Sequence, residues 1–225
     1  MLNFDFSSLT PSTIATLASG MVISLQVAGT ALGVGLVWGT VLAMMRLSRF
    51  RALSLVATVY VNLFRSVPLA MVLLSFYLIV PQVLRSLFNT ATDTRLLSAL
   101  VGFALFESAY YAEIIRAGIQ SVPKGQLGAA LALGMKPLQA MRIVVLPQAF
   151  KNMLPLLFTQ LIALFQDTSL VYVISLSDFF TGAEGIGERD GRIEEMMIVA
   201  GAVYFIICFS ASTLIKRLSA KGQLS

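Results

Sequence analysis

The chain has 225 residues, of which 57% are hydrophobic and only 12% charged, and its formal net charge is +5. Soluble domains carry about 25% charged residues, and so little charge could not cover a surface that faces water. The composition therefore excludes a soluble globular protein and predicts one bundle of membrane-spanning helices. With a single cysteine, Cys208, and no histidine, the sequence has no internal disulfide and lacks the usual ligands of a zinc or haem site.

Stretches with few or no charged residues locate the predicted spans, because a helix that crosses the bilayer needs about 20 mostly apolar residues. The first predicted span covers about residues 14–45, the second about 53–80 and the third about 96–115. Each of these three segments is long enough to cross the membrane as one helix.

The fourth predicted span is interrupted. An apolar run over 153–165 is followed by the polar residues 166–169 and then by a second apolar run over 170–176. Broken helices at membrane depth are tolerated only where they line protein or a watery cavity. The fifth span, about 196–215, is unbroken. We therefore predict an all-α integral membrane fold with about five transmembrane helices, the fourth of them discontinuous, in a single domain over residues 1–225.

Basic residues favour one side of this topology, which holds eleven of the sixteen Lys and Arg residues. They are Arg46, Arg49, Arg51, Arg116, Lys124, Lys136, Arg142, Lys151, Lys216, Arg217 and Lys221. Since cytoplasmic loops carry an excess of Lys and Arg, we expect this side to be cytoplasmic, with the N-terminus outside and the C-terminus inside. The positive net charge then follows from topology, and no nucleic-acid partner is expected.

The basic loop between spans three and four, about residues 120–147, contains a short predicted helix. Pro123 suits its first turn, Gly134 suits a left-handed C-terminal position, and Pro137 can open a second helix. Small residues over 128–130 leave one surface of the helix nearly bare, so the backbone of another protein could approach it closely. Packing within the bundle is the alternative use of such a helix.

The spacing of this loop resembles the signature of binding-protein-dependent ABC importer permeases: Glu-Ala-Ala, three residues, Gly, nine residues, Ile, any residue, Leu-Pro. In that family the loop forms a coupling helix that sits in a cleft of the ATPase subunit. The resemblance carries this role to Ala129, Ala130, Gly134, Leu146 and Pro147, with Gly128 at the position of the family's Glu and Val144 at that of its Ile. Valine keeps the apolar contact, whereas glycine removes a charge from the docking surface.

The resemblance extends over nearly the whole chain and narrows to permeases for polar amino acids, above all those of glutamate/aspartate importers. The segments that carry it are 62–69, 112–126, 146–150, 165–173 and 186–191. It implies a permease subunit that translocates amino acids across the bacterial cytoplasmic (inner) membrane, driven by ATP. Glutamate and aspartate are the expected substrates, and another polar amino acid such as glutamine or arginine is the alternative.

The same resemblance implies the partners: a dimer of ATPase subunits, a second permease chain that is identical or similar, and a periplasmic or extracellular substrate-binding protein. The sequence contains no Gly-x-x-x-x-Gly-Lys-Ser/Thr loop for binding nucleotide phosphates. We therefore expect no enzymatic activity and no cofactor in this chain, with ATP and magnesium bound by the partner ATPase.

Arg65 is a charged residue at the predicted depth of the membrane, where a charge is costly unless it faces a watery cavity or an ionic partner. A guanidinium group can bind a carboxylate through two parallel hydrogen bonds, and every amino-acid substrate carries a carboxylate. Arg65 is therefore a candidate for the substrate path. The alternatives are an ion pair with Asp167 or Glu107, or hydrogen bonds to the carbonyl groups that Pro68 leaves without a donor.

The polar residues at the interruption of the fourth span are further candidates for the substrate path. Asp167 offers an acceptor for a substrate ammonium group, and Thr168 and Ser169 offer hydroxyl groups. In the family that the chain resembles, this segment lies beside the translocation pore. We expect the three residues to line the path.

Two spacings predict contacts between or along helices. Glu113 and Arg116 are three residues apart, as ion-paired neighbours on one helix face are. In the first span, the pairs Gly29/Gly33 and Gly35/Gly39 are four residues apart, which allows another helix to approach closely, and we expect this packing within the pair of permease chains.

Function classes outside this family fit less well. A self-sufficient secondary transporter would use buried acids such as Glu107 and Asp167 for ion coupling, but the chain is short and has no recognisable inverted repeat. An intramembrane enzyme is disfavoured because the sequence has no histidine and no recognisable pair of nucleophile and base.

Overall fold

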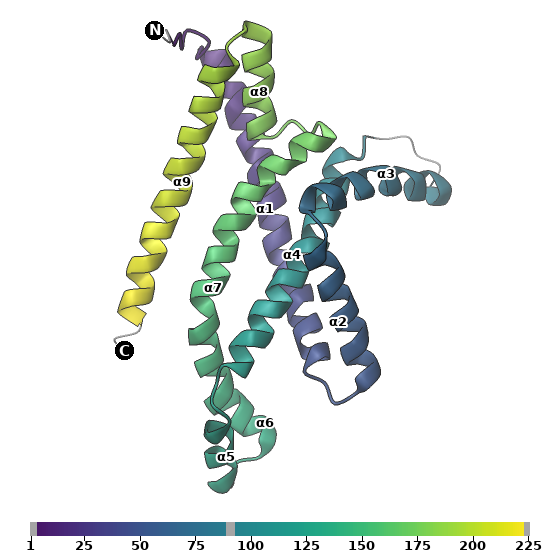
Figure 1. Ribbon diagram of the computed structural model, residues 1–225, viewed down its shortest axis with the longest axis vertical. Helices are drawn as coiled ribbons and strands as arrows, with labels where there is room; N and C mark the ends of the chain where they lie inside the picture. Colours follow the sequence, from purple (N-terminus) through teal and green to yellow (C-terminus); the bar gives the residue numbers. More distant parts are fainter. Residues whose placement is uncertain (1–3, 89–92, 223–225) are drawn as a thin grey trace.

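The computed structural model describes residues 4–88 and 93–222, and the regular structure in these two ranges is helical (Figure 1). The helices are α1 (Pro11–Arg46), α2 (Arg51–Ser66), α3 (Leu69–Phe88), α4 (Arg95–Gln120), α5 (Lys124–Ala132), α6 (Pro137–Ala140), the π-helix η1 (Met141–Val145), α7 (Leu146–Asp167), the 3-10 helix η2 (Thr168–Ile174), α8 (Phe179–Asp190) and α9 (Ile193–Gly222). Of the predicted domain, residues 1–3, 89–92 and 223–225 lie outside the described residues.

Within the described residues, five stretches are long and apolar enough to cross a membrane, which confirms the predicted all-α membrane fold. They are Pro11–Arg46, Leu69–Leu87, Arg95–Gln120, Pro137–Ile174 and Ile193–Arg217. The N-terminal residues and α8 lie at one end of the bundle, and α5 and α6 lie at the opposite end (Figure 1).

The second predicted span is two helices, so the expectation of one helix over 53–80 is wrong. Helix α2 ends at Ser66, Val67 is extended with φ −111° and ψ 136°, and α3 leads away in a different direction (Figure 1). The cause is Pro68, which has no N–H group and disfavours the helical conformation in the residue before it. Arg65 therefore lies in the last turn of α2 and not within a continuous helix.

The interruption predicted in the fourth span is a change of helix type. The α-helical hydrogen bonding of α7 ends at Asp167, and the tighter 3-10 helix η2 continues to Ile174. Helix α7 also begins earlier than predicted, at Leu146, because Pro147 occupies its first turn, where a missing N–H group is harmless. The polar residues 166–169 thus lie at the junction between the two helix types.

Helices α1 and α4 cross closely at the centre of the bundle. A Cβ atom on Gly39 would lie 2.8 Å from the carbonyl oxygen of Ser108 and 2.9 Å from the Cβ atom of Tyr111, and one on Gly35 would lie 3.1 Å from the Tyr111 ring. The close approach of another helix is therefore confirmed for Gly35 and Gly39, and that helix is α4 of the same chain. A Cβ atom on Gly29 or Gly33 would meet nothing within 4 Å.

Helix α8, which the sequence analysis did not predict, is fixed to α1 by its N-terminal residue Asp178. The buried carboxylate accepts hydrogen bonds from the amide (2.9 Å) and hydroxyl (2.7 Å) of Thr181 and from the Ser24 hydroxyl (3.2 Å). Burial raises the pKa of Asp178, whereas these donors favour its charged form. A Cβ atom on Gly20 would lie 2.6 Å from the Asp178 carbonyl oxygen, so α1 and the start of α8 are in direct contact.

Candidate functional site

The loop that resembles a coupling helix forms the predicted structure. Helix α5 follows Pro123 and is closed by Gly134, whose φ is +82°. The amides of Gly134 and Met135 donate to the carbonyl groups of Leu131 (3.0 Å) and Ala130 (3.2 Å), as at many helix ends closed by glycine. Pro137 opens α6. The local roles predicted for Gly134 and Pro137 are confirmed.

This loop is anchored to the ends of α4 and α7. Val122, Val145 and Ala149 form a buried apolar cluster, and the Asn152 side-chain amide donates to the Ser121 hydroxyl at 2.8 Å. A Cβ atom on Gly118 would lie 2.7 Å from the Cβ atom of Met153, so α4 and α7 approach closely at the same level. A force on α5 would therefore reach both long helices.

The candidate coupling surface consists of the exposed residues Gly128, Ala129, Leu133, Gly134, Leu146 and Pro147. Ala130, also predicted to couple, is only 3% exposed and packs inward. Leu133 is 81% exposed, and the sequence analysis did not single it out. A large apolar side chain held out among small residues is a natural anchor for a partner protein. A Cβ atom on Gly128 would meet nothing within 4 Å, so the glycine leaves open space where the family has Glu.

The positive φ of Gly134 makes it the sensitive glycine of this loop. We expect Gly134→Ala to destabilise the end of α5 by about 1 kcal/mol, because a Cβ atom is strained in the left-handed region. Gly125→Ala, inside α5 with open space around it, should instead be neutral or stabilising. Limited proteolysis of the loop in the purified protein measures the difference, and equal protection of the two variants would contradict the prediction.

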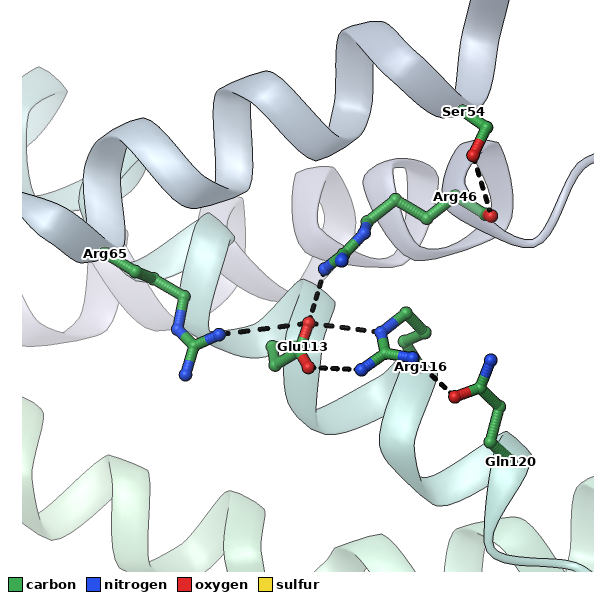
Figure 2. A network of polar contacts seen from close by, with 6 residues as sticks. All are labelled: Arg46, Ser54, Arg65, Glu113, Arg116 and Gln120. Carbon is green, nitrogen blue, oxygen red and sulfur yellow. Dashed lines mark hydrogen bonds and ion pairs between the residues drawn. The ribbon is translucent and has the colours of Figure 1, made fainter. Parts of the chain in front are cut away.

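Three arginines from three helices converge on Glu113 of α4, as Figure 2 shows. Arg116 donates to both carboxylate oxygens, from Nε at 3.1 Å and from Nη2, and Arg46 of α1 donates to Oε2. Arg65 of α2 lies farther away, with Nη1 3.9 Å from Oε2 and its guanidinium group 5.5 Å from the centre of the Tyr110 ring. We call Arg46, Arg65, Glu113 and Arg116 the Glu113 cluster.

The Glu113 cluster decides between the ion pairs predicted from the sequence. The pair of Glu113 and Arg116 is confirmed. The alternative in which Arg65 pairs with Asp167 or Glu107 is wrong, because the carboxylate within 4 Å of Arg65 among the described residues is that of Glu113. Sequence reasoning could not find this partner, which lies on another helix, 48 positions along the chain.

Asp167, Thr168 and Ser169 lie at the junction of α7 and η2. Asp167 is half-buried. The fully buried Thr168 donates its hydroxyl to the Phe165 carbonyl at 2.7 Å, and Ser169 donates to the Gln166 carbonyl at 2.9 Å. Both hydroxyl donors are therefore used by the helix itself, which leaves the Asp167 carboxylate as the charged acceptor of the junction.

Ser169 borders a hollow between α7, α8 and α9. Its volume is about 300 Å³, and Gln166, Ser169, Phe180, Ala200, Gly201, Met197 and Tyr204 line it. The hollow carries polar groups on the side of α7 and mainly apolar ones on the side of α9. One edge of the predicted path thus adjoins a space of the size of a small molecule.

Glu107 is fully buried on α4, and its carboxyl oxygens accept hydrogen bonds from Nε2 of Gln160 on α7 at 3.0 and 3.2 Å. It therefore links α4 to α7 through a neutral donor. Within residues 4–88 and 93–222, no three His, Cys, Asp or Glu side chains are grouped so that they could hold a metal ion.

Comparison with known proteins agrees with this architecture. The family described as "Binding-protein-dependent transport system inner membrane component" matches residues 35–221. The chain is 56% identical over 97% of its length to "Glutamate/aspartate import permease protein GltK" of Escherichia coli O157:H7, of which 98% is covered. It is 35% identical over 92% of its length to "Arginine transport system permease protein ArtQ" of Bacillus subtilis (strain 168), of which 91% is covered.

A solved structure agrees as well. The crystal structure of an amino acid ABC transporter with histidines contains a chain that superposes with a TM-score of 0.87 at 33% sequence identity, covering 98% of this chain and 100% of that one. Together with the matched sequence, this likeness includes the spans, the loop with α5 and the segment after Asp167. The chain therefore belongs to the family of binding-protein-dependent transport system inner membrane components.

Proposed function

We propose that the chain is the permease subunit of an ATP-driven importer of acidic amino acids, with glutamate and aspartate as its substrates. The observation that supports these substrates is the 56% identity to a glutamate/aspartate import permease over 97% of the chain. The identity to an arginine permease is lower, at 35%. Since only one of these relatives handles acidic substrates, the difference favours a dicarboxylic amino acid.

The proposed complex contains two permease chains, this one and an identical or similar one, two ATPase subunits and an outside substrate-binding protein. The ATPase subunits bind ATP and magnesium and dock on the coupling surface. The exposed Leu133 and the neighbouring small residues support this docking. The excess of Lys and Arg on the side of α5 supports a cytoplasmic location for that end, with the N-terminus outside and the C-terminus in the cytoplasm.

In the proposed path, Arg65 binds a substrate carboxylate and Asp167 binds the substrate ammonium group. Two observations support this role of Arg65. Its side chain is 40% exposed, and it donates no hydrogen bond to another described residue. Thr168 and Ser169 complete the path as residues that hold the junction of α7 and η2, with Ser169 beside the hollow.

ATP-dependent uptake tests the proposed function. Proteoliposomes would contain the permease with its ATPase and binding-protein partners, and labelled glutamate, aspartate, glutamine and arginine would be compared. Uptake of the acidic pair supports the proposal. Uptake of glutamine or arginine alone keeps the importer and discards the substrate, and uptake driven by an ion gradient without the ATPase overturns the proposal.

Asp167→Asn tests the path in the same assay. We expect glutamate uptake to fall about tenfold or more, because an ammonium group gains more from a carboxylate than from an amide. Asp93→Asn is the matched control, because the Asp93 side chain is 59% exposed and paired with Arg95 at the start of α4. Unchanged uptake by Asp167→Asn would remove Asp167 from the path.

A further inference from the structure

The Glu113 cluster contains more positive than negative charge. Three guanidinium groups lie within 4 Å of one carboxylate, which leaves a surplus of two positive charges. Guanidinium groups stay protonated in proteins, so the surplus cannot be removed by loss of a proton. Arg46 and Arg116 expose only 14% and 24% of their side chains. Unbalanced charge on partly buried side chains is costly, which calls for an anion that offsets it.

The geometry identifies the arginine that is available to such an anion. The carboxylate oxygens of Glu113 already accept three hydrogen bonds from Arg46 and Arg116. Arg116 also donates to the side-chain oxygen of Gln120. Arg65, at 3.9 Å from Glu113, is outside hydrogen-bonding distance and is the most exposed of the three arginines. A second carboxylate can therefore bind Arg65 without displacing Glu113 from the other two.

We propose that the surplus charge of the Glu113 cluster selects substrates with two carboxylates over their amide counterparts. The inference rests on the proposed function and deepens it. Arg65 makes the contact, and Arg46 and Arg116 act as positioning residues that occupy Glu113 so that it does not neutralise Arg65. A glutamate side chain gains from the surplus, whereas the isosteric but neutral glutamine side chain does not.

Substitutions that change the surplus in opposite directions test the proposal. Arg46→Gln lowers it by one charge and Glu113→Gln raises it by one. The assay measures how well unlabelled glutamate and unlabelled glutamine each displace labelled glutamate from the permease–ATPase complex. The binding protein is left out, because it has a selectivity of its own. We expect Arg46→Gln to reduce the preference for glutamate about tenfold. Glu113→Gln should keep or increase it.

Arg49→Gln is the matched control, because Arg49 lies in the turn between α1 and α2 and carries the same charge outside the Glu113 cluster. It should leave the preference unchanged. Arg65→Lys keeps the charge but loses the paired donors, so it should weaken glutamate binding more than it changes the preference. Thermal unfolding of each complex identifies variants that do not fold. If Arg46→Gln is one of them, Glu113→Gln carries the test, because a loss of preference in that variant would overturn the proposal.

The outcomes separate the possibilities. An equal loss of preference in Arg46→Gln and Glu113→Gln would overturn the proposal, because it would show a purely structural ion-pair network. A wild-type complex that binds no acidic amino acid would overturn both this inference and the proposed function. An equal preference for glutamate in Arg46→Gln and Arg49→Gln would overturn this inference alone.

Discussion

Replacing Gly39 with leucine is expected to prevent α1 from packing against α4 and so to abolish folding of the chain. A Cβ atom at this position would lie 2.8 Å from the Ser108 carbonyl oxygen and 3.0 Å from the Ala112 amide nitrogen. Backbone atoms cannot rotate away, so the two helices would have to separate. We expect a loss of about 3 kcal/mol or more in the free energy of unfolding. The yield of monodisperse protein in detergent and its thermal unfolding measure the effect.

Gly33→Leu provides the matched control on the same helix. A Cβ atom at Gly33 would meet nothing within 4 Å, so the added side chain should leave the folding of the single chain intact. A stable Gly39→Leu variant would show that α1 and α4 are packed less closely than described here.

Leu133→Glu is expected to uncouple the permease from its ATPase subunits. The side chain is 81% exposed at the end of α5, so the fold of the chain should not change, whereas a docked ATPase would bury an unpaired carboxylate. Central apolar anchors contribute about 2 kcal/mol or more to an interface. We therefore expect transport-coupled ATP hydrolysis to fall at least about thirtyfold.

Leu53→Glu is the control, because Leu53 is a 45% exposed leucine near the start of α2, outside the coupling surface. It should retain coupled hydrolysis. Co-purification of the ATPase with each variant distinguishes failed docking from failed coupling, and normal hydrolysis by Leu133→Glu would contradict the prediction.

Much of the fold follows from local patterns in the sequence. Long apolar stretches with few or no charges predicted the five spans, and the roles of Gly134 and Pro137 follow from the backbone freedom of glycine and the missing N–H group of proline. The break between α2 and α3 carried the same kind of signal in Pro68, but the apolar residues around it favoured a continuous span. Helix α8 was missed because its three glycines and three acidic residues resemble a solvated loop.

The candidate site was less predictable, because its contacts depend on how distant segments pack. The close spacing of Glu113 and Arg116 sufficed to predict their ion pair, whereas the approach of Arg46 and Arg65 requires the arrangement of α1 and α2 around α4. The exposure of Leu133 likewise depends on the side of α5 that faces η1. Periodicity alone cannot distinguish an anchor from a core residue on so short a helix.

The length of the fourth span depends on the 3-10 helix η2. Its seven residues rise about 14 Å, whereas the same seven residues in an α-helix would rise about 10.5 Å and turn about 140° less. Rewinding η2 into an α-helix would therefore draw the start of α8 inward by about 3.5 Å. Because Asp178 is in direct contact with Gly20, that shortening would have to displace α1 as well. A change of helical pitch at the end of the fourth span would therefore move the first span.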